Sequence, residues 1–130
     1  LAGALNNRLA MVERRAEIAA DVQVRDMPPL PVAIEETFYR VALEALNNAL
    51  RHAQARRVVI NLRAHDHHLL MTIQDNGVGF RLREARAKGG MGLSSMESRV
   101  RSVGGSVKFI SRIGEGTRVE VRAPLPPGDE

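Results

Sequence analysis

Hydrophobic and polar residues alternate along LLMTIQD, residues 69–75, as they do in a half-buried β-strand. Leu69, Met71 and Ile73 share one side of this predicted strand, and Asp75 at its end falls on the same apolar side. A carboxylate without a partner on a buried face is energetically costly. We therefore expect Asp75 to face a group that requires it.

Similar patterns along the chain predict alternating helices and strands with no internal repeat. Three helices are expected, at residues 4–19, 32–53 and 93–103, and Gly104-Gly105 stops the last of them. Five strands are expected, at residues 21–24, 57–64, 69–75, 106–111 and 117–123. These elements form most simply a two-layer α+β sandwich, a mixed five-stranded sheet with the three helices on one face.

The last predicted strand offers a partner for Asp75. Thr117 has the same alternation phase as Val119 and Val121, on the side expected to be buried. If this strand pairs antiparallel with the strand ending at Asp75, the hydroxyl and the carboxylate meet at one end of the sheet.

Length and composition suit a single domain of 130 residues, with a leading helix and strand in residues 1–31, a core in 32–123 and a tail in 124–130. Aromatic residues are only 3%, so the core is expected to be aliphatic. There are no cysteines and no window apolar enough to span a bilayer, which favours a cytoplasmic domain without direct membrane contact. A longer parent protein is compatible with membrane anchoring.

The formal charge of +4 raises the question of nucleic acid. The arginines are scattered, and no basic stripe is interleaved with aromatic residues as stacking on single strands would require. A solvated basic surface, or a site for polyphosphate, is the better interpretation.

The helix predicted at 32–53 has a wide apolar arc and a narrow polar stripe. Glu44, Asn48 and Arg51 follow one another at i, i+4 and i+7, with His52 at the edge of the stripe. Such a stripe often faces solvent. Here an acid, a carboxamide and a guanidinium share one side of a mostly buried helix, which favours the wall of a pocket.

Two glycine-rich segments follow. DNGVGF holds Gly77 and Gly79, and AKGGMGL places Gly90 and Gly92 directly ahead of a helix. Glycine lets backbone approach a ligand closely, and a helix N-terminus presents free amides to a phosphate. Neither segment is a P-loop or a Rossmann fingerprint, since GxxxxGK[ST] and a strand-to-helix GxGxxG are both missing.

In order along the chain, EALNNALRH, DNGVGF, GGMGL and GEGT resemble the N, G1 and G2 boxes and the closing Gly-Thr of the GHKL ATPase superfamily, which has the Bergerat fold. The resemblance spans about residues 32–123. YRVALEALNNALRHA and GGMGLSSMESRV are most similar to sensor histidine kinases of the NarL/DesK type. Only residues 81–89 separate the G1 box from the next glycines, which resembles the short lid of that subfamily.

The resemblance implies that ATP and Mg²⁺ are the cofactors. Asp75 would accept a hydrogen bond from the adenine amine, which selects ATP over GTP, and Thr117 would assist through its hydroxyl. Asn48 would give its carboxamide oxygen to Mg²⁺. Glu44 would be the catalytic residue that orients a metal-bound water or polarises the attacking group.

The remaining implied contacts go to the nucleotide. Arg51 and, more weakly, His52 would contact phosphate oxygens. Gly77 and Gly79 would let the chain turn under the base. The GGMGL box, with Gly90, Met91, Gly92 and Leu93, would wrap the triphosphate. The lid, residues 81–91, has few apolar anchors, so we expect it to be mobile until nucleotide binds.

The resemblance also implies partners, namely a dimerisation domain carrying the phosphoaccepting histidine and a response regulator. His65-Asp66 lies in a predicted turn after the N box, so we expect it to be neither that acceptor nor, with His67 and His68, a metal site. Two alternatives stay open, an anti-sigma-factor serine kinase and a non-catalytic module in which ATP gates dimerisation. Leu43 stands where relatives usually have Gln; it lies on the apolar arc, so little effect on ATP is expected.

Overall fold

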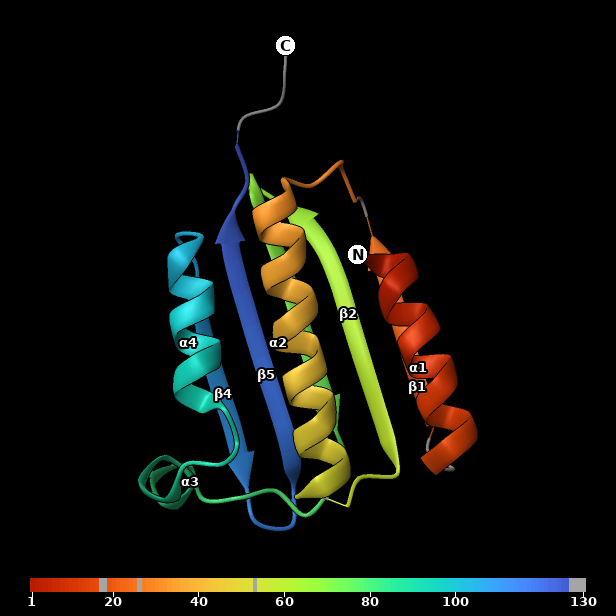
Figure 1. Ribbon diagram of the computed structural model, residues 1–130, viewed down its shortest axis with the longest axis vertical. Helices are drawn as coiled ribbons and strands as arrows, with labels where there is room; N and C mark the ends of the chain where they lie inside the picture. The colour runs from red at the N-terminus through yellow and green to blue at the C-terminus, as the bar shows by residue number, and fades with distance from the viewer. Residues whose placement is uncertain (17–18, 26, 53, 127–130) are drawn as a thin grey trace.

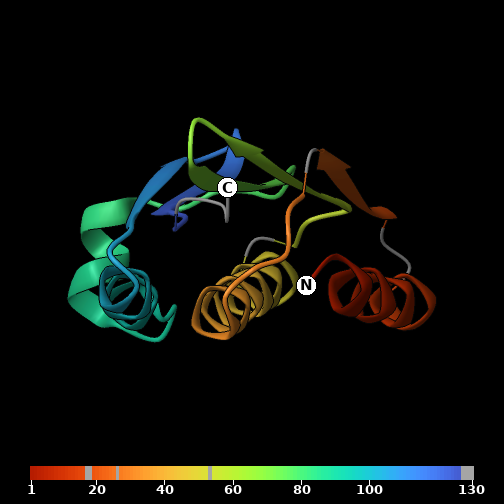
Figure 2. The ribbon, with the colours of Figure 1, turned by 90° about the horizontal axis from the view of Figure 1, so that it is seen from above.

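The computed structural model describes residues 1–16, 19–25, 27–52 and 54–126, which form a sheet layer and a helix layer on one face of the sheet (Figures 1 and 2). The helices are α1 (Ala2–Ala16), α2 (Val32–Arg51), α3 (Leu82–Lys88) and α4 (Leu93–Ser102). The strands are β1 (Ala19–Arg25), β2 (Arg57–His65), β3 (His68–Asp75), β4 (Ser106–Arg112) and β5 (Gly116–Pro124). The predicted fold class is therefore confirmed.

The strand order in the sheet is β1-β2-β3-β5-β4. β1 pairs parallel with β2, while β2 with β3, β3 with β5, and β4 with β5 are antiparallel. The β2–β3 connection is a two-residue hairpin, in which Asp66 and His67 both adopt positive φ. The antiparallel pairing of β3 with β5 places Asp75 directly opposite Thr117, as the alternation predicted.

The core lies between the helices and the inner face of the sheet. Phe38 and Val41 on α2, Met96 on α4, and Leu69 and Met71 on β3 are at most 1% exposed. Apart from Phe38 and Phe109, the buried apolar residues are aliphatic or sulfur-containing, as the low aromatic content requires. None of the helices formed by the described residues covers the opposite face of the sheet (Figure 2).

Two features differ from the predicted pattern. The described residues form four helices rather than three, because α3 forms within the segment expected to be a mobile lid. Ala19, expected in the first helix, begins β1 instead: its amide donates to the Arg56 carbonyl and its Cα pairs with Arg57, so pairing with β2 decides its conformation. Residues 17 and 18, at the predicted end of that helix, and Ala53 lie outside the described residues.

The end of α4 follows the predicted glycine stop. Gly104 has φ 78°, and its amide donates to the Arg101 carbonyl, while the amide of Gly105 donates to the Val100 carbonyl. This pair of bonds is a Schellman motif, which satisfies carbonyls that the helix end leaves free. The chain then reverses into β4.

The turn between β4 and β5 holds two glycines of positive φ with different surroundings. A Cβ on Gly116 would lie 2.3 Å from the Asp75 carbonyl oxygen, whereas a Cβ on Gly114 would meet nothing within 4 Å. The close approach of Gly116 to β3 is therefore part of the pairing that positions Thr117.

We expect Gly116→Ala to lower the free energy of unfolding by about 2–4 kcal/mol, from left-handed backbone strain together with overlap on β3. Gly114→Ala is the matched control, because it has the same strain without the overlap and should cost about 1–2 kcal/mol. Urea unfolding of both variants measures the difference. Equal losses would mean that β3 yields to the new methyl group.

Candidate functional site

Asp75 ends β3 with its side chain on the inner face of the sheet, only 7% exposed. The Gly77 amide donates to Asp75 Oδ1 at 2.8 Å, so the loop after the strand turns back over the carboxylate. Thr117, also 7% exposed, lies opposite it at the start of β5. These are the two buried polar side chains among the described residues, and the structure brings them together.

Burial raises the pKa of the Asp75 carboxyl, and hydrogen bonds from the Gly77 and Thr117 backbones oppose the rise in part. A raised pKa means that the folded state holds the proton more tightly than the unfolded state does. Stability contributed by the protonated form is then lost as pH rises from the ordinary carboxyl range through the raised pKa. Ionised Asp75 therefore destabilises the empty domain, as expected of a group kept for binding.

Ser111 supports this end of the sheet, and the sequence pattern did not single it out. Its hydroxyl lies 2.8 Å from the Thr117 hydroxyl and accepts the Phe80 amide at 2.9 Å. The signal was available in the register, since Ser111 on β4 is paired with Thr117. Ser111 thus ties the candidate hydroxyl to the chain leaving the G1 segment.

Asn76 was likewise missed, although it lies within DNGVGF. Its side-chain oxygen accepts the amides of Arg56 and Arg57 at 2.9 and 2.8 Å, and its own amide donates to the Arg57 carbonyl. Asn76 therefore fixes the G1 segment to the start of β2 rather than facing the pocket.

Asn48 approaches from α2 on the opposite wall. Its Nδ2 donates to the Met91 carbonyl at 2.8 Å. Because a carbonyl only accepts, the nitrogen of the carboxamide must face Met91, and Oδ1 is directed elsewhere. Within the described part of the chain, no hydrogen bond involves Oδ1. This oxygen is available to a ligand.

Glu44 lies one turn before Asn48 and beside Gly92. A Cβ on Gly92 would come within 2.6 Å of Glu44 Oε1, and Gly92 itself has φ 67° as the N-cap of α4. The left-handed backbone therefore favours glycine at this position, and any side chain there would also have to displace the Glu44 carboxylate. Gly90, at φ 86°, has open space around its Cα.

A pocket lies between these walls. It is lined by Ala45, Asn48, Ile73, Asp75, Phe80, Met91, Leu93, Met96, Phe109, Thr117 and Val119. Only about 10 Å³ of it is open, the space of about one water molecule. A far larger hollow, about 1080 Å³, lies on the helix-free face of the sheet, but none of the candidate residues lines it. We assign the site to the small pocket because the buried polar groups converge there.

Five of the predicted residues therefore line one pocket: Asn48, Asp75, Met91, Leu93 and Thr117. The others lie around it or away from it. Arg51 and His52 are exposed at the C-terminal end of α2, outside the lining. Gly79 packs against the end of β4, since a Cβ added there would lie 2.1 Å from the Arg112 carbonyl oxygen, and its implied place under the base stays a prediction. Leu43 is half-buried, and it joins neither the lining nor the core cluster.

The lid carries a helix that is attached to the body of the domain. Ala85 on α3 is buried, Leu82 packs against the core, and Arg86 pairs with Glu97 of α4 at 2.5 Å. The Arg86 guanidinium also lies 5.9 Å from the centre of the Phe109 ring. The segment thus has only two apolar anchors in α3, and the ion pair and the ring contact of Arg86 add to them. Ordering by nucleotide stays a prediction.

The His65–His68 turn lies at the opposite end of β3 from Asp75. His68 Nδ1 contacts the Asp66 carbonyl at 2.9 Å. No cluster of three or more metal-ligating side chains occurs among the residues that the structure describes. Within the same residues, no helix has the length and hydrophobicity needed to cross a membrane.

The pocket combines an acid from β3, a hydroxyl from β5 and a carboxamide from α2. We compared the sequence with models of known protein families. A model described as the histidine kinase-, DNA gyrase B- and HSP90-like ATPases matches residues 33–127. The chain belongs to this ATPase family. Among its members, the chain is similar to the sensor protein VraS of Staphylococcus aureus, with 38% identity over 96 residues.

VraS of Staphylococcus epidermidis matches equally, again at 38%. In both cases 74% of this chain is aligned, but it spans only 27% of the length of the relative. The histidine kinase domain of the Erythrobacter litoralis EL346 blue-light activated histidine kinase matches with a TM-score of 0.75 and 26% identity, covering 95% of this chain and 58% of that one. These matches show that the chain is similar to part of two sensor proteins and to the ATPase portion of a histidine kinase domain, and that it spans only a fraction of each of them.

The Acinetobacter baumannii histidine kinase AdeS has the same fold, with a TM-score of 0.76 at 15% identity over 96% of this chain and 64% of that one. At this identity the likeness concerns the fold alone.

We expect Glu97→Gln to speed hydrogen exchange of the amides in residues 81–91 about three- to tenfold in the empty domain, because it removes the charge that holds Arg86. Glu84→Gln is the matched control, since it removes the same charge from an exposed pair with Arg81 in the same segment. Mg-ATP should slow exchange across residues 81–93 in the unmodified domain. Identical exchange with and without nucleotide would show that this segment is not a lid.

Proposed function

We propose that this domain binds Mg-ATP in the pocket beneath Asp75 and transfers the γ-phosphate to a histidine on a dimerisation domain of its parent kinase, outside this chain. A response regulator would then receive the phosphoryl group. The proposal also places the domain in the cytoplasm, where ATP is supplied. It rests on the family, on the similarity to sensor proteins and on the geometry of the pocket.

The buried Asp75 carboxylate carries the proposal. An ionised carboxylate only accepts hydrogen bonds, so it suits the exocyclic amine of adenine. Guanine has an oxygen at that position, and two acceptors would then face each other without a proton between them. The apolar lining from Ile73, Met96 and Val119 suits the faces of a purine ring. Thr117 supplies a second polar contact beside the base.

Mg²⁺ fits the donor that α2 presents. Oδ1 of Asn48 is a neutral oxygen ligand, which a hard cation accepts, and a Mg²⁺ ion bound with phosphates keeps most of its ligands as phosphate oxygens and waters. One protein oxygen is therefore sufficient. The cation would neutralise charge on the triphosphate.

The other predicted residues surround the same region. Glu44, beside Gly92 and one turn from Asn48, is placed to orient a water or the attacking imidazole. The first amides of α4, after Gly92, would receive phosphate oxygens. Gly90 leaves space for them, and Arg51 and His52 would turn toward the phosphates from the end of α2. Gly77 holds the Asp75 carboxylate in position.

The nearly filled pocket implies that the nucleotide displaces part of the wall. Met91 is the mobile candidate, because it closes the pocket from the glycine-rich G2 segment and its carbonyl holds Asn48. If Met91 moved away, the nitrogen of Asn48 would be released and the carboxamide would be free to present Oδ1 to the cation. Nucleotide entry and positioning of the metal ligand would thus be coupled.

We expect Asp75→Asn to weaken ATP binding about 10- to 100-fold, because the amide places a donor against the adenine amine. The empty variant should be at least as stable as the unmodified domain at neutral pH, since it lacks the ionised buried carboxylate. This difference should vanish in acid below the ordinary carboxyl pKa, where Asp75 is protonated in both states.

Calorimetric titration with ATP and thermal unfolding across pH measure the two effects. Unchanged ATP affinity in a folded Asp75→Asn variant would remove Asp75 from the site. Glu115→Gln, which removes the same charge from an exposed residue of the β4–β5 turn, serves as the control for the loss of a charge.

We expect Asn48→Ala to reduce phosphoryl transfer at least 100-fold while changing metal-free nucleotide binding much less. Asn47→Ala, at the neighbouring position on the stripe, is the control. The assay supplies the domain with a dimerisation helix that carries a histidine, and in parallel with a serine-bearing acceptor. Normal transfer by Asn48→Ala contradicts the metal assignment. Transfer to serine alone favours the serine kinase, and ATP-dependent dimerisation without transfer favours the gating module.

A further inference from the structure

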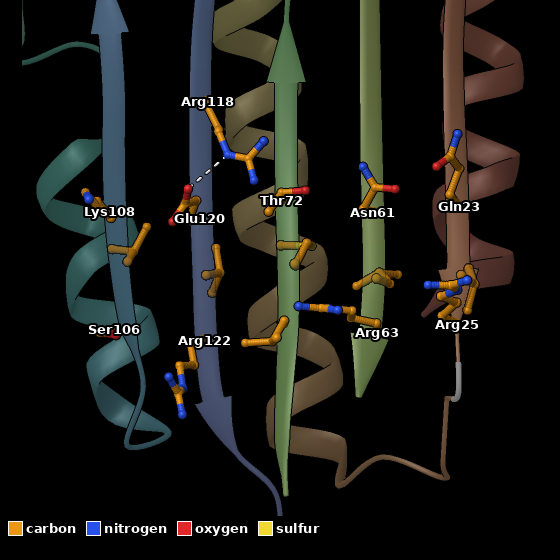
Figure 3. A pocket seen from close by; sticks show the side chains of 16 residues that line it. Gln23, Arg25, Asn61, Arg63, Thr72, Ser106, Lys108, Arg118, Glu120 and Arg122 are labelled. Carbon is orange, nitrogen blue, oxygen red and sulfur yellow. Dashed lines mark hydrogen bonds and ion pairs between the residues drawn. The ribbon is translucent and has the colours of Figure 1, made fainter. Parts of the chain in front are cut away.

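The helix-free face of the sheet carries a hollow of about 1080 Å³ whose lining is strongly basic (Figure 3). Five cations line it, Arg25, Arg63, Lys108, Arg118 and Arg122, against one carboxylate, Glu120. Their net charge equals the +4 of the entire chain, so the other 14 basic and 14 acidic residues balance. The excess basic residues are scattered along the sequence, but the fold brings them together on one face of the sheet.

The strand register places three of these arginines in one row. Arg25 on β1 is paired with Arg63 on β2, Arg63 with Leu70 on β3, and Leu70 with Arg122 on β5. Figure 3 shows Arg63 and Arg122 on either side of β3. Neighbouring strands are about 4.8 Å apart, so the backbones of Arg63 and Arg122 are about 10 Å apart with Leu70 between them.

The charges of this row are not neutralised within the described residues. The only ion pair on this face that those residues form joins Arg118 to Glu120 at 2.9 Å, the dashed line in Figure 3. Arg25, Arg63 and Arg122 are exposed and take part in no ion pair with any described residue. Like charges directly opposite one another destabilise a sheet. A ligand with carboxylates would remove that repulsion.

We propose that this face, defined by Arg25, Arg63, Leu70, Lys108 and Arg122, is a docking surface for an acidic polypeptide segment of a partner protein. Carboxylates match the guanidinium row bidentately, and Leu70 gives an aliphatic contact at its centre. Asn61 and Thr72 add uncharged hydrogen-bonding groups to the floor of the hollow (Figure 3). The surface faces away from the nucleotide pocket, so both can be occupied together.

A polypeptide suits the surface better than other anions. None of the four aromatic residues of the chain lines the hollow, so bases would find no stacking platform. The cations surround a depression, whereas a planar lipid surface makes its best contact with protruding groups. A polypeptide can enter the depression with carboxylates on its edges and an aliphatic side chain at its centre.

The test measures binding of a fluorescein-labelled peptide of glutamate and leucine, with its glutamine-for-glutamate counterpart as the uncharged probe. We expect the acidic peptide alone to bind at low salt, and the affinity to fall as salt is raised. The triple variant Arg25→Gln/Arg63→Gln/Arg122→Gln should lose about 10- to 30-fold in affinity. Leu70→Ser should weaken binding without changing its dependence on salt.

The matched control is Arg8→Gln/Arg99→Gln/Arg101→Gln, which removes the same charge from exposed positions on α1 and α4 and should change the affinity less than threefold. Equal losses in the two triple variants, or no binding of the acidic peptide, overturn the proposal. Tighter binding of polyuridylate or of phosphatidylserine vesicles than of the peptide, lost in the first triple variant, overturns it in favour of nucleic acid or membrane. ATP affinity, measured in parallel, should be the same in all variants.

Discussion

The antiparallel pairing of β3 with β5 is the contact on which the pocket depends. It sets Asp75 opposite Thr117, and β4 adds Ser111 opposite Thr117 in the same row. Gly116 allows the approach, because any side chain there would overlap the Asp75 carbonyl. If β5 were shifted by one residue along β3, Asp75 would be paired with a residue whose side chain points to the outer face of the sheet instead of with Thr117. The packing of the sheet and the geometry of the site are therefore one constraint.

The helix layer completes the pocket by joining segments far apart in sequence. Asn48 on α2 and Met91 ahead of α4 are connected by a single hydrogen bond, and Glu44 limits what can stand at Gly92. Arg86 and Glu97 extend the connection to α3. The N box, the G2 segment and the lid thus behave as parts of one wall, while the sheet provides a fixed opposite wall.

The sequence predicted much of this because the alternation in strands and the glycine stops are local signals. It placed Asp75 and Thr117 on one face, and their meeting required only the antiparallel pairing that was assumed. It missed α3, because a helix of seven residues with two apolar anchors is too short for its helical periodicity to be recognised. In addition, the residues that contact Arg86, Glu97 and Phe109, come from elsewhere in the chain. Ser111 and Asn76 were missed because their partners are set by register and loop geometry. The basic face was read as scattered arginines, since the charges converge only when five strands are aligned.

The small volume left in the pocket has a kinetic consequence. If the nucleotide enters this pocket as proposed, the domain would bind it only in the fraction of molecules in which Met91 and Phe80 have moved aside. The apparent affinity is the intrinsic affinity reduced by that fraction, and association is slower than diffusion allows. A contact that loosens or tightens the G2 segment, such as one made by a neighbouring domain, would then change how much of the pocket is occupied by ATP. It would do so without any contact with the adenine base. Under the proposed binding mode, the hydrogen bond between Asn48 and Met91 would be the point at which such control acts.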